Sequence, residues 1–277
     1  MGNNVWWLRS IKDIVCWFSG GRDSAVACYI AKKVAASRGW GFRLVHVDTR
    51  TPRPRDVDEY VRAYAAFLGV ELTVIRPELS FKEYAARYSY WPSITRPHMR
   101  WCYYHLKREP IIRFLRSDAR ARAALHVFGI RKNESLFRER EYDSPYGVKC
   151  YEEGLCVRFW LPLLYLSSSA VDALARRFNI PRSPVWDRLG TSGECQCLAG
   201  TAYSTLVRLR IHYPEVVREL VEIDDVIQSR RRSGPSYPQP LVAKRMTLRQ
   251  WFETFRPPAT LDKFFYTGKA CQGSCML

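Results

Sequence analysis

The stretch that decides the fold is VCWFSGGRDSAVA, from Val15 to Ala27. An apolar run at residues 14–18 predicts a buried strand, and a helical pattern follows without a breaker over residues 24–38. The turn between them contains Gly20 and Gly21, which allow the backbone to approach a ligand closely. Because the first amides of a helix have no partner within the helix, this strand–turn–helix junction predicts a phosphate-binding loop.

Three polar side chains of the turn refine this prediction. Ser19 and Ser24 add hydroxyl donors for phosphate oxygens. Asp23 does not fit a simple anion site, because a carboxylate repels phosphate unless a metal ion lies between them. The loop therefore predicts a nucleotide bound as its magnesium complex. The alternative is a glycine-rich turn that only joins a strand to a helix.

Composition narrows the class of protein. The chain has 277 residues, of which 47% are hydrophobic, enough for one large core or a core with an appendage. No apolar run is long enough to span a membrane and no signal peptide precedes the first strand, so we expect a cytoplasmic protein with no membrane partner. The 44 Lys and Arg residues outnumber 27 Asp and Glu, and the net charge of +17 favours nucleic acid as a partner. A basic surface that reflects only solubility or lineage is the alternative.

Strand and helix patterns alternate up to about residue 180. Short crossovers of this type predict an α/β fold with a doubly wound, mainly parallel, five-stranded sheet flanked by helices. We expect a nucleotide-binding domain at residues 1–200 and a helical, basic C-terminal extension at 201–277, which includes a basic loop at 230–235 and a cysteine-containing tail. The strands are expected at residues 14–18, 42–47, 71–75, 126–130 and 157–161. The helices are expected at residues 24–38, 56–68, 103–116, 168–178, 203–211, 214–227 and 247–255.

The wording SGGRDS resembles the pyrophosphate-binding loop (PP-loop) of the N-type ATP pyrophosphatases. Further segments, in the same order, are similar to the PAPS reductase-like family of that adenine nucleotide alpha hydrolase-like superfamily, where PAPS is 3′-phosphoadenosine 5′-phosphosulfate. The resemblance covers about residues 10–200. The matching segments are VDT at Val47–Thr49, RWCYYHLKREP at Arg100–Pro110, FGIRKNES at Phe128–Ser135, and LPL at Leu161–Leu163 followed by IPRSPVWDR at Ile180–Arg188.

The resemblance implies ATP and Mg²⁺ as ligands and assigns roles to residues. Asp23 and Arg131 are the catalytic candidates, Asp48 is placed for a ribose hydroxyl or a metal, and Gly129 is expected to let the nucleotide approach a strand end. An Asp48 that only caps a turn is the alternative. The nucleotide-binding candidates are Phe18, Ser19, Gly20, Gly21, Arg22, Asp23, Ser24, Asp48, Lys107, Gly129 and Arg131.

Nine cysteines in a cytosolic protein indicate metal or redox use before structural disulfides. Iron–sulfur members of the family place ligands where this chain has Cys102, Cys195 and Cys197. The resemblance therefore implies a [4Fe–4S] cluster, with its last iron open or with a fourth thiolate from elsewhere. Zinc and three inert thiols are the alternatives. The candidates for the fourth thiolate are Cys150, Cys156, Cys271 and Cys275.

The other cysteines leave two further questions open. The Arg- and Pro-rich, Met-poor composition is compatible with a thermophilic source, in whose cytosol disulfides such as Cys150–Cys156 or Cys271–Cys275 can form. Lys269 could lower the pKa of a nearby tail thiol and make it a nucleophile. The alternative is an incidental pair of cysteines at a disordered end.

Two enzymatic functions and one binding function follow. The first is an ATP-dependent adenylyl transferase that releases pyrophosphate and prepares a nucleic acid, with tRNA favoured, for sulfur transfer from a donor or reductant. The second is a sulfonucleotide reductase in which Arg131, Lys107 and Arg100 grip a sulfate and a tail cysteine attacks sulfur. The third is a non-catalytic nucleic-acid-binding module. The complete loop, with Asp23 and Ser24, favours the first. The oligomeric state stays open, a homodimer included, and so does any role of His46, His98 and His105.

Overall fold

The computed structural model describes residues 10–93, 97–199, 201–230 and 247–256. Their packing divides the chain into two compact units. Unit 1 is formed by segments within Met1–Asp48, Asp58–Arg76 and Arg108–Ser183, and unit 2 by segments within Thr49–Val57, Pro77–Lys107 and Pro184–Leu277. The domain boundary expected at residue 200 stays a prediction. The expected basic loop beyond Arg230 and the tail with Lys269, Cys271 and Cys275 lie outside the described residues.

Unit 1 is built on a six-stranded sheet with the order β3-β2-β1-β4-β6-β5. All neighbouring pairs are parallel except β5 and β6, which are antiparallel. The mainly parallel α/β fold is therefore confirmed, and the five expected strands are all present. The expected number of strands was one too low, because β5 adds an antiparallel edge. The strands are β1 (Asp13–Trp17), β2 (Gly41–Val47), β3 (Leu72–Ile75), β4 (Leu125–Val127), β5 (Tyr146–Glu152) and β6 (Leu155–Trp160).

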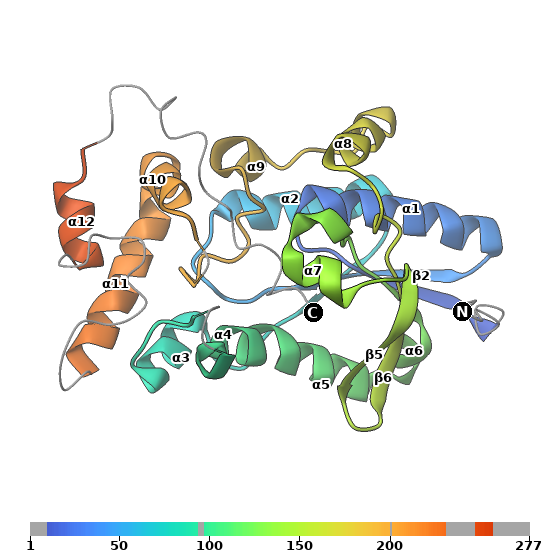
Figure 1. The fold of residues 1–277 in the computed structure, drawn as a ribbon, viewed down its shortest axis with the longest axis horizontal. Helices are drawn as coiled ribbons and strands as arrows, with labels where there is room; N and C mark the ends of the chain where they lie inside the picture. Colours follow the sequence, from blue (N-terminus) through green and yellow to red (C-terminus); the bar gives the residue numbers. More distant parts are fainter. Residues whose placement is uncertain (1–9, 94–96, 200, 231–246, 257–277) are drawn as a thin grey trace. The chain divides into compact units, whose positions relative to one another are not determined.

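Helices cover both faces of this sheet, with α1 and α8 on one face and α5 and α6 on the other (Figure 1). The central strand β1 is buried from Ile14 to Trp17, as expected for a parallel strand covered on both sides. A disulfide between Cys16 and Cys28 joins β1 to α1 in this core. The helices are α1 (Arg22–Arg38), α2 (Arg55–Leu68, in unit 1 from Asp58), α5 (Glu109–Ser117), α6 (Ala119–Ala123), α7 (Leu136–Glu141) and α8 (Ser168–Arg177), with a 3₁₀ turn at Lys132–Glu134.

Unit 2 is helical, and its longest helix, α11, packs against α3, α10 and α12. The buried Asp224 of α11 accepts hydrogen bonds from the Trp91 indole (2.8 Å) and from the backbone of Leu248 in α12 (3.3 Å). The three expected C-terminal helices are confirmed. The helices are α3 (Phe81–Tyr88), α4 (Trp101–Tyr103), α9 (Pro184–Leu189), α10 (Tyr203–His212), α11 (Pro214–Arg230) and α12 (Leu248–Thr254), with a 3₁₀ turn at Pro97–Met99 and a π-helical turn at Tyr104–Arg108. No helix among the described residues has both the length and the apolar character that a membrane crossing needs.

Candidate active site

The strand order of unit 1 fixes where a ligand can bind. The chain adds β2 and β3 on one side of β1, whereas β4 and β6 lie on the other side. The order therefore reverses between β1 and β4, and a crevice forms beyond the carboxyl ends of strands at such a switch point. The loop after β1 and the segment after β4 both begin at this point. They carry most of the residues that the sequence singles out.

The loop after β1 leaves the first turn of α1 open to a ligand. Gly20 has a φ of 73°, a left-handed conformation that glycine adopts without strain. Gly21 is the N-cap of α1, and no side chain caps this helix end. Ser24 instead stabilises the loop, because its hydroxyl donates to the Gly21 carbonyl (2.9 Å) and accepts from the Ser19 amide (3.2 Å). The positive end of α1 is thus presented by a loop with a defined shape.

Two arginines converge on Asp23 at the start of α1. The Nε atoms of Arg22 and Arg131 donate to different carboxylate oxygens of Asp23, at 2.7 Å and 2.6 Å. Arg22 also donates to Asp172 of α8 (2.9 Å). Burial alone would lower the pKa of Arg22, but its hydrogen bonds to Asp23 and Asp172 raise the pKa above the ordinary value. Asp23 therefore fixes two permanently charged guanidinium groups beside the loop.

The predicted magnesium contact of Asp23 does not follow from this arrangement. Both oxygens of the carboxylate accept hydrogen bonds from arginines, so this donor set does not fit a directly bound Mg²⁺ as it stands. Within the described part of the chain, no group of three or more His, Cys, Asp or Glu side chains is arranged to hold a metal ion. The magnesium role of Asp23 stays a prediction.

Gly129 follows β4 and lies directly against α1. A Cβ atom at this position would lie 2.5 Å from the Cα atom of Ser24 and 2.6 Å from the carbonyl carbon of Asp23. The contact is between two backbone segments, so a shift of either one would cost free energy. In the structure this glycine therefore lets the segment after β4 pack on the phosphate loop, which brings Arg131 to Asp23. The expected approach of a nucleotide to Gly129 stays a prediction.

A second ion pair, which the sequence does not single out, supports Arg131. The backbone amide of Arg131 donates to the carboxylate of Glu134 (3.3 Å), and Glu134 forms an ion pair with the buried Arg138 of α7. Glu134 and Ser135, the last two residues of the FGIRKNES segment, are the part of the sequence that indicates this arrangement. Ser135 caps α7, because its hydroxyl accepts a hydrogen bond from the Arg138 amide. Glu134 thus fixes the backbone of Arg131, and Arg138 fixes Glu134.

Phe18, Asp48 and His46 surround the loop at the ends of β1 and β2. The Phe18 side chain is buried and stacks on Tyr64, with ring centroids 4.2 Å apart. Phe18 therefore packs in the core directly before the loop. Asp48 accepts a hydrogen bond from Arg76 (2.8 Å). His46 donates from Nδ1 to the Phe18 carbonyl (2.8 Å), and its Nε2 is buried without a hydrogen-bond partner. The sequence did not decide whether His46 has a role. In the structure His46 is bonded to the residue that directly precedes the loop.

The remaining predicted site residues, Lys107, Cys102, Cys195 and Cys197, all belong to unit 2. Cys195 shares a hydrogen bond with Cys197, and this bond together with burial raises the pKa of the Cys195 thiol well above its usual range. The described residues do not fit a cluster site, because they bring no third ligand to this pair in a metal-binding arrangement. Cys150 and Cys156 form a disulfide between β5 and β6. They are therefore not thiolates for a fourth ligand.

The fold and the loop at the switch point define the class of this protein: an adenine nucleotide alpha hydrolase-like domain. The model of the phosphoadenosine phosphosulfate reductase domain matches residues 13–205. The chain therefore belongs to the phosphoadenosine phosphosulfate reductase domain family, a family of nucleotide-binding domains.

The solved structures that are similar to this chain include a reductase and a synthetase. The phosphoadenylyl-sulfate (PAPS) reductase from Candida auris, a phosphate complex, aligns with 18% identity and a TM-score of 0.48 over 66% of this chain and 81% of its own. The NAD⁺ synthetase from Burkholderia pseudomallei aligns with 15% identity and a TM-score of 0.37 over 83% of this chain and 86% of its own. No curated protein sequence matches the chain.

Proposed function

We propose that this protein binds ATP at the loop after β1 and transfers its adenylyl group to an acceptor, with release of pyrophosphate. The observation that carries the proposal is the geometry of SGGRDS. The loop presents the uncapped N-terminus of α1, and a reductase substrate without a β,γ-pyrophosphate would not need this complete phosphate cradle. In this proposal the amides of the loop hold the β- and γ-phosphates.

Arg22 and Arg131 are the charged groups that act on the reaction. An acceptor oxygen attacks the α-phosphorus, the bond to the β-phosphate oxygen breaks, and pyrophosphate leaves with the electron pair. Negative charge increases on the leaving group, and fixed guanidinium groups stabilise such charge because they need no reorganisation. Asp23 positions both arginines and neutralises one of their two charges.

The proposed acceptor is a nucleic acid, with tRNA favoured. The support is the net charge of +17, which attracts polyanions over a long range. A second step then replaces the adenylated oxygen: sulfur from a donor attacks the acceptor carbon and AMP leaves. This step needs a sulfur donor or reductant as a further partner.

The test is pyrophosphate release. Purified protein is incubated with ATP in the presence and absence of bulk tRNA, and pyrophosphate, AMP and phosphate are measured separately. The proposal predicts release of pyrophosphate that increases with tRNA. An equal amount of AMP is expected only when a sulfur donor is added, because the adenylyl group otherwise stays on the acceptor.

The same preparation is incubated with a sulfonucleotide and a thiol reductant. Release of sulfite together with no turnover of ATP would reject the adenylyl transfer and assign the protein to sulfonucleotide reduction. Release of phosphate and ADP instead of pyrophosphate would also contradict the proposal, because it places the attack on the γ-phosphorus.

A further inference from the structure

One stretch of the chain combines aromatic and basic residues in a way that the proposed function does not use. Seven of the 25 residues from 84 to 108 are Trp or Tyr, whereas aromatic residues make up 14% of the whole chain. Five more are Lys or Arg, and none is Asp or Glu. The stretch includes the end of α3 and all of α4, which lie next to each other in unit 2 (Figure 1). Surfaces that bind single-stranded nucleic acid need these two residue types together.

The buried rings of this stretch belong to the core of unit 2 and support the other rings. Trp91 and Trp101 are each 2% exposed. Trp101 stacks on Tyr88 of α3, with ring centroids 5.4 Å apart and an angle of 11° between the planes. The Tyr88 hydroxyl also shares a hydrogen bond with His105 Nε2 (2.6 Å). Because Tyr88 is half-buried, these contacts fix its ring while part of the ring stays accessible.

Three further tyrosines of the stretch reach the surface. Tyr90 is half-buried, and its ring centroid lies 5.6 Å from that of Tyr88. Tyr103 is also half-buried and contacts Tyr104 edge-on, with centroids 5.5 Å apart. Tyr104 is 45% exposed. Tyrosine has only two side-chain torsions, so such rings bind a partner at a low cost in conformational entropy.

Positive charge lies beside these rings. The Arg100 guanidinium lies above the Tyr103 ring, 5.1 Å from its centroid. Arg87 of α3 is exposed, and Arg230 of α11 donates a hydrogen bond to the Ala86 carbonyl at the same end of α3 (3.2 Å). Since this stretch of sequence contains no acidic residue, its own cations are not offset within it, and they attract phosphates.

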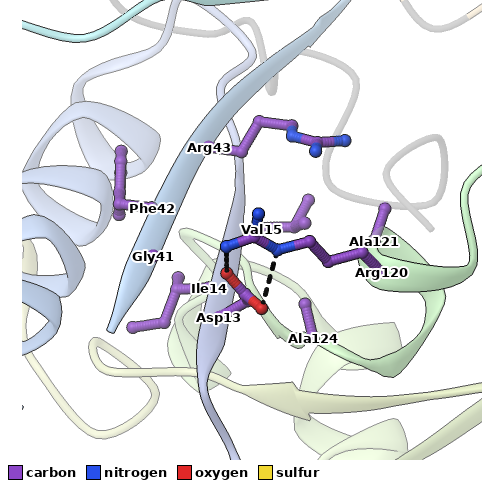
Figure 2. Close-up of a pocket in the computed structure, with 9 residues that line it drawn as sticks. All are labelled: Asp13, Ile14, Val15, Gly41, Phe42, Arg43, Arg120, Ala121 and Ala124. Atoms are coloured by element: carbon purple, nitrogen blue, oxygen red, sulfur yellow. Dashed lines mark hydrogen bonds and ion pairs between the residues drawn. The ribbon is translucent and has the colours of Figure 1, made fainter. Parts of the chain in front are cut away.

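A basic pocket of unit 1 is built differently. There Arg120 donates two hydrogen bonds to Asp13, of 3.0 Å and 2.6 Å (Figure 2). Arg43, which lines the same pocket, forms an ion pair with Asp118. Both arginines therefore have a carboxylate partner, and the residues that line the pocket include a single aromatic ring, Phe42. This pocket has neither the tyrosines nor the excess of positive charge, so it supplies a control for the test.

We propose that unit 2 binds unpaired bases of a nucleic acid on the aromatic–basic surface formed by Tyr88, Tyr90, Tyr103, Tyr104, Arg87 and Arg100. Bases of a single strand stack on the tyrosine rings, and the arginines contact the phosphates. Bases within a duplex are stacked on one another, so the surface selects single strands and unpaired loops. The proposal rests on the nucleic-acid acceptor of the proposed function. Its test contains no ATP, so its failure leaves the adenylyl transfer to be decided by pyrophosphate release.

The test compares the affinity of the full-length protein for single strands and for a duplex. Fluorescence anisotropy is measured with a labelled single-stranded RNA of about 12 nucleotides, with the same RNA as a duplex, and with a single-stranded DNA of the same sequence. The proposal predicts that the single strands bind more tightly than the duplex. Equal binding of single strand and duplex, or no binding of either, would overturn it.

Tyr104→Ala tests the stacking. Loss of one stacked base should weaken single-strand binding by about 5-fold to 100-fold, whereas Tyr104→Phe keeps the ring and should bind like the parent. Tyr165→Ala is the matched control, because Tyr165 is a 62% exposed tyrosine of unit 1, and its affinity should not change. Equal affinities of the two alanine variants would overturn the proposal. A Tyr104→Phe protein that binds as weakly as Tyr104→Ala would do the same.

Arg87→Gln tests the phosphate contacts. The slope of log affinity against log salt concentration should become shallower by about 0.7, the contribution of one phosphate of a single strand. Arg120→Gln removes an exposed arginine that Asp13 already neutralises, and it should leave the slope unchanged. Identical slopes of the parent and the Arg87→Gln protein would contradict the proposed role of Arg87.

Discussion

At the residue scale, the candidate active site depends on one carboxylate between two guanidinium groups. Asp23 and Arg22 are neighbours in the chain, but Arg131 is 108 positions away and reaches Asp23 only because Gly129 allows the two backbones to touch. The sequence could predict the loop, because a short glycine-rich turn before a helix has a local cause. It could not predict that Asp23 faces arginines, since that depends on how β4 is placed beside β1.

Replacing Asp23 by alanine removes the acceptor that positions both arginines. We expect pyrophosphate release to fall by about 10²-fold or more, the effect of losing a preorganised charge-stabilising group. The fold should remain, because Asp23 lies at the start of a helix whose other contacts are unchanged. Activity and circular dichroism measure the two effects.

Asp172→Asn is the matched control for this variant. It removes only the outer, partly exposed partner of Arg22, and exposed ion pairs contribute about 1 kcal/mol or less. We expect this variant to keep its activity within severalfold of the parent. A fully active Asp23→Ala protein would contradict the role assigned to Asp23.

Gly129→Ala tests the backbone contact between β4 and α1. The added methyl group would lie 2.5 Å from Ser24, so the loop must shift. Overpacking of this kind costs about 1–3 kcal/mol, and we expect weaker ATP binding as well. Gly154→Ala is the control, since Gly154 has a φ of 73° but no atom within 4 Å of the added group. Equal ATP affinity of both variants would argue against the contact as the reason for Gly129.

At the scale of elements, a disulfide closes the segment that contains the phosphate loop. Cys16 of β1 and Cys28 of α1 are 12 positions apart and completely buried. In the chain-entropy model, closing a loop of this length stabilises the folded state by about 3 kcal/mol. We therefore expect Cys16→Ala/Cys28→Ala to lower the free energy of unfolding in guanidinium by about that amount.

The hairpin of β5 and β6 provides the comparison. Cys150 and Cys156 close a shorter loop, so Cys150→Ala/Cys156→Ala should cost less, about 2 kcal/mol. If removing the buried pair cost nothing while removing the hairpin pair did, the account of the buried disulfide would be wrong.

His126 of β4 joins two elements, because its Nδ1 accepts from Trp17 of β1 (2.9 Å) and its Nε2 donates to the Ala121 carbonyl of α6 (2.9 Å). Burial lowers the pKa of His126 to about 4. The unfolded chain therefore binds this proton below its ordinary pKa of 6.5, whereas the folded chain does not. Folding stability should be complete above pH 6.5 and fall by about 3 kcal/mol toward pH 4.

A glutamine at this position can replace both hydrogen bonds but does not titrate. His126→Gln should therefore show a flatter decrease of the free energy of unfolding between those pH values. Identical slopes for the parent and the variant would show that other groups cause the acid sensitivity.

Regular elements could be predicted where their apolar pattern is continuous. The expected strand at residues 14–18 is β1 within one residue, and the helix expected at 24–38 begins two residues earlier. Strand β5 could not be predicted, because it is an edge strand with an exposed Cys150 and a mixed burial pattern. The structure divides the single helix expected at 103–116 among the end of α4, the π-helical turn at Tyr104–Arg108 and α5. Pro110, at the start of α5, has no backbone N–H to continue the regular hydrogen-bond pattern.

At the scale of the whole molecule, the net charge makes a prediction about nucleic acid. If the protein contacts six or more phosphates of tRNA, its affinity should fall by about 10³-fold or more between about 50 and 200 mM salt. Fluorescence anisotropy of labelled tRNA over a salt series measures this slope. Affinity that does not change with salt would mean that the positive charge does not bind phosphates.

The central claim is that the loop from Ser19 to Ser24 receives the terminal phosphates of ATP. A crystal structure of the protein with a non-hydrolysable ATP analogue tests this claim most directly. The account predicts the β- and γ-phosphates within hydrogen-bond distance of the amides at the start of α1, with the α-phosphate toward Arg131. Phosphates bound elsewhere, or a loop closed by its own side chains at saturating analogue, would contradict it.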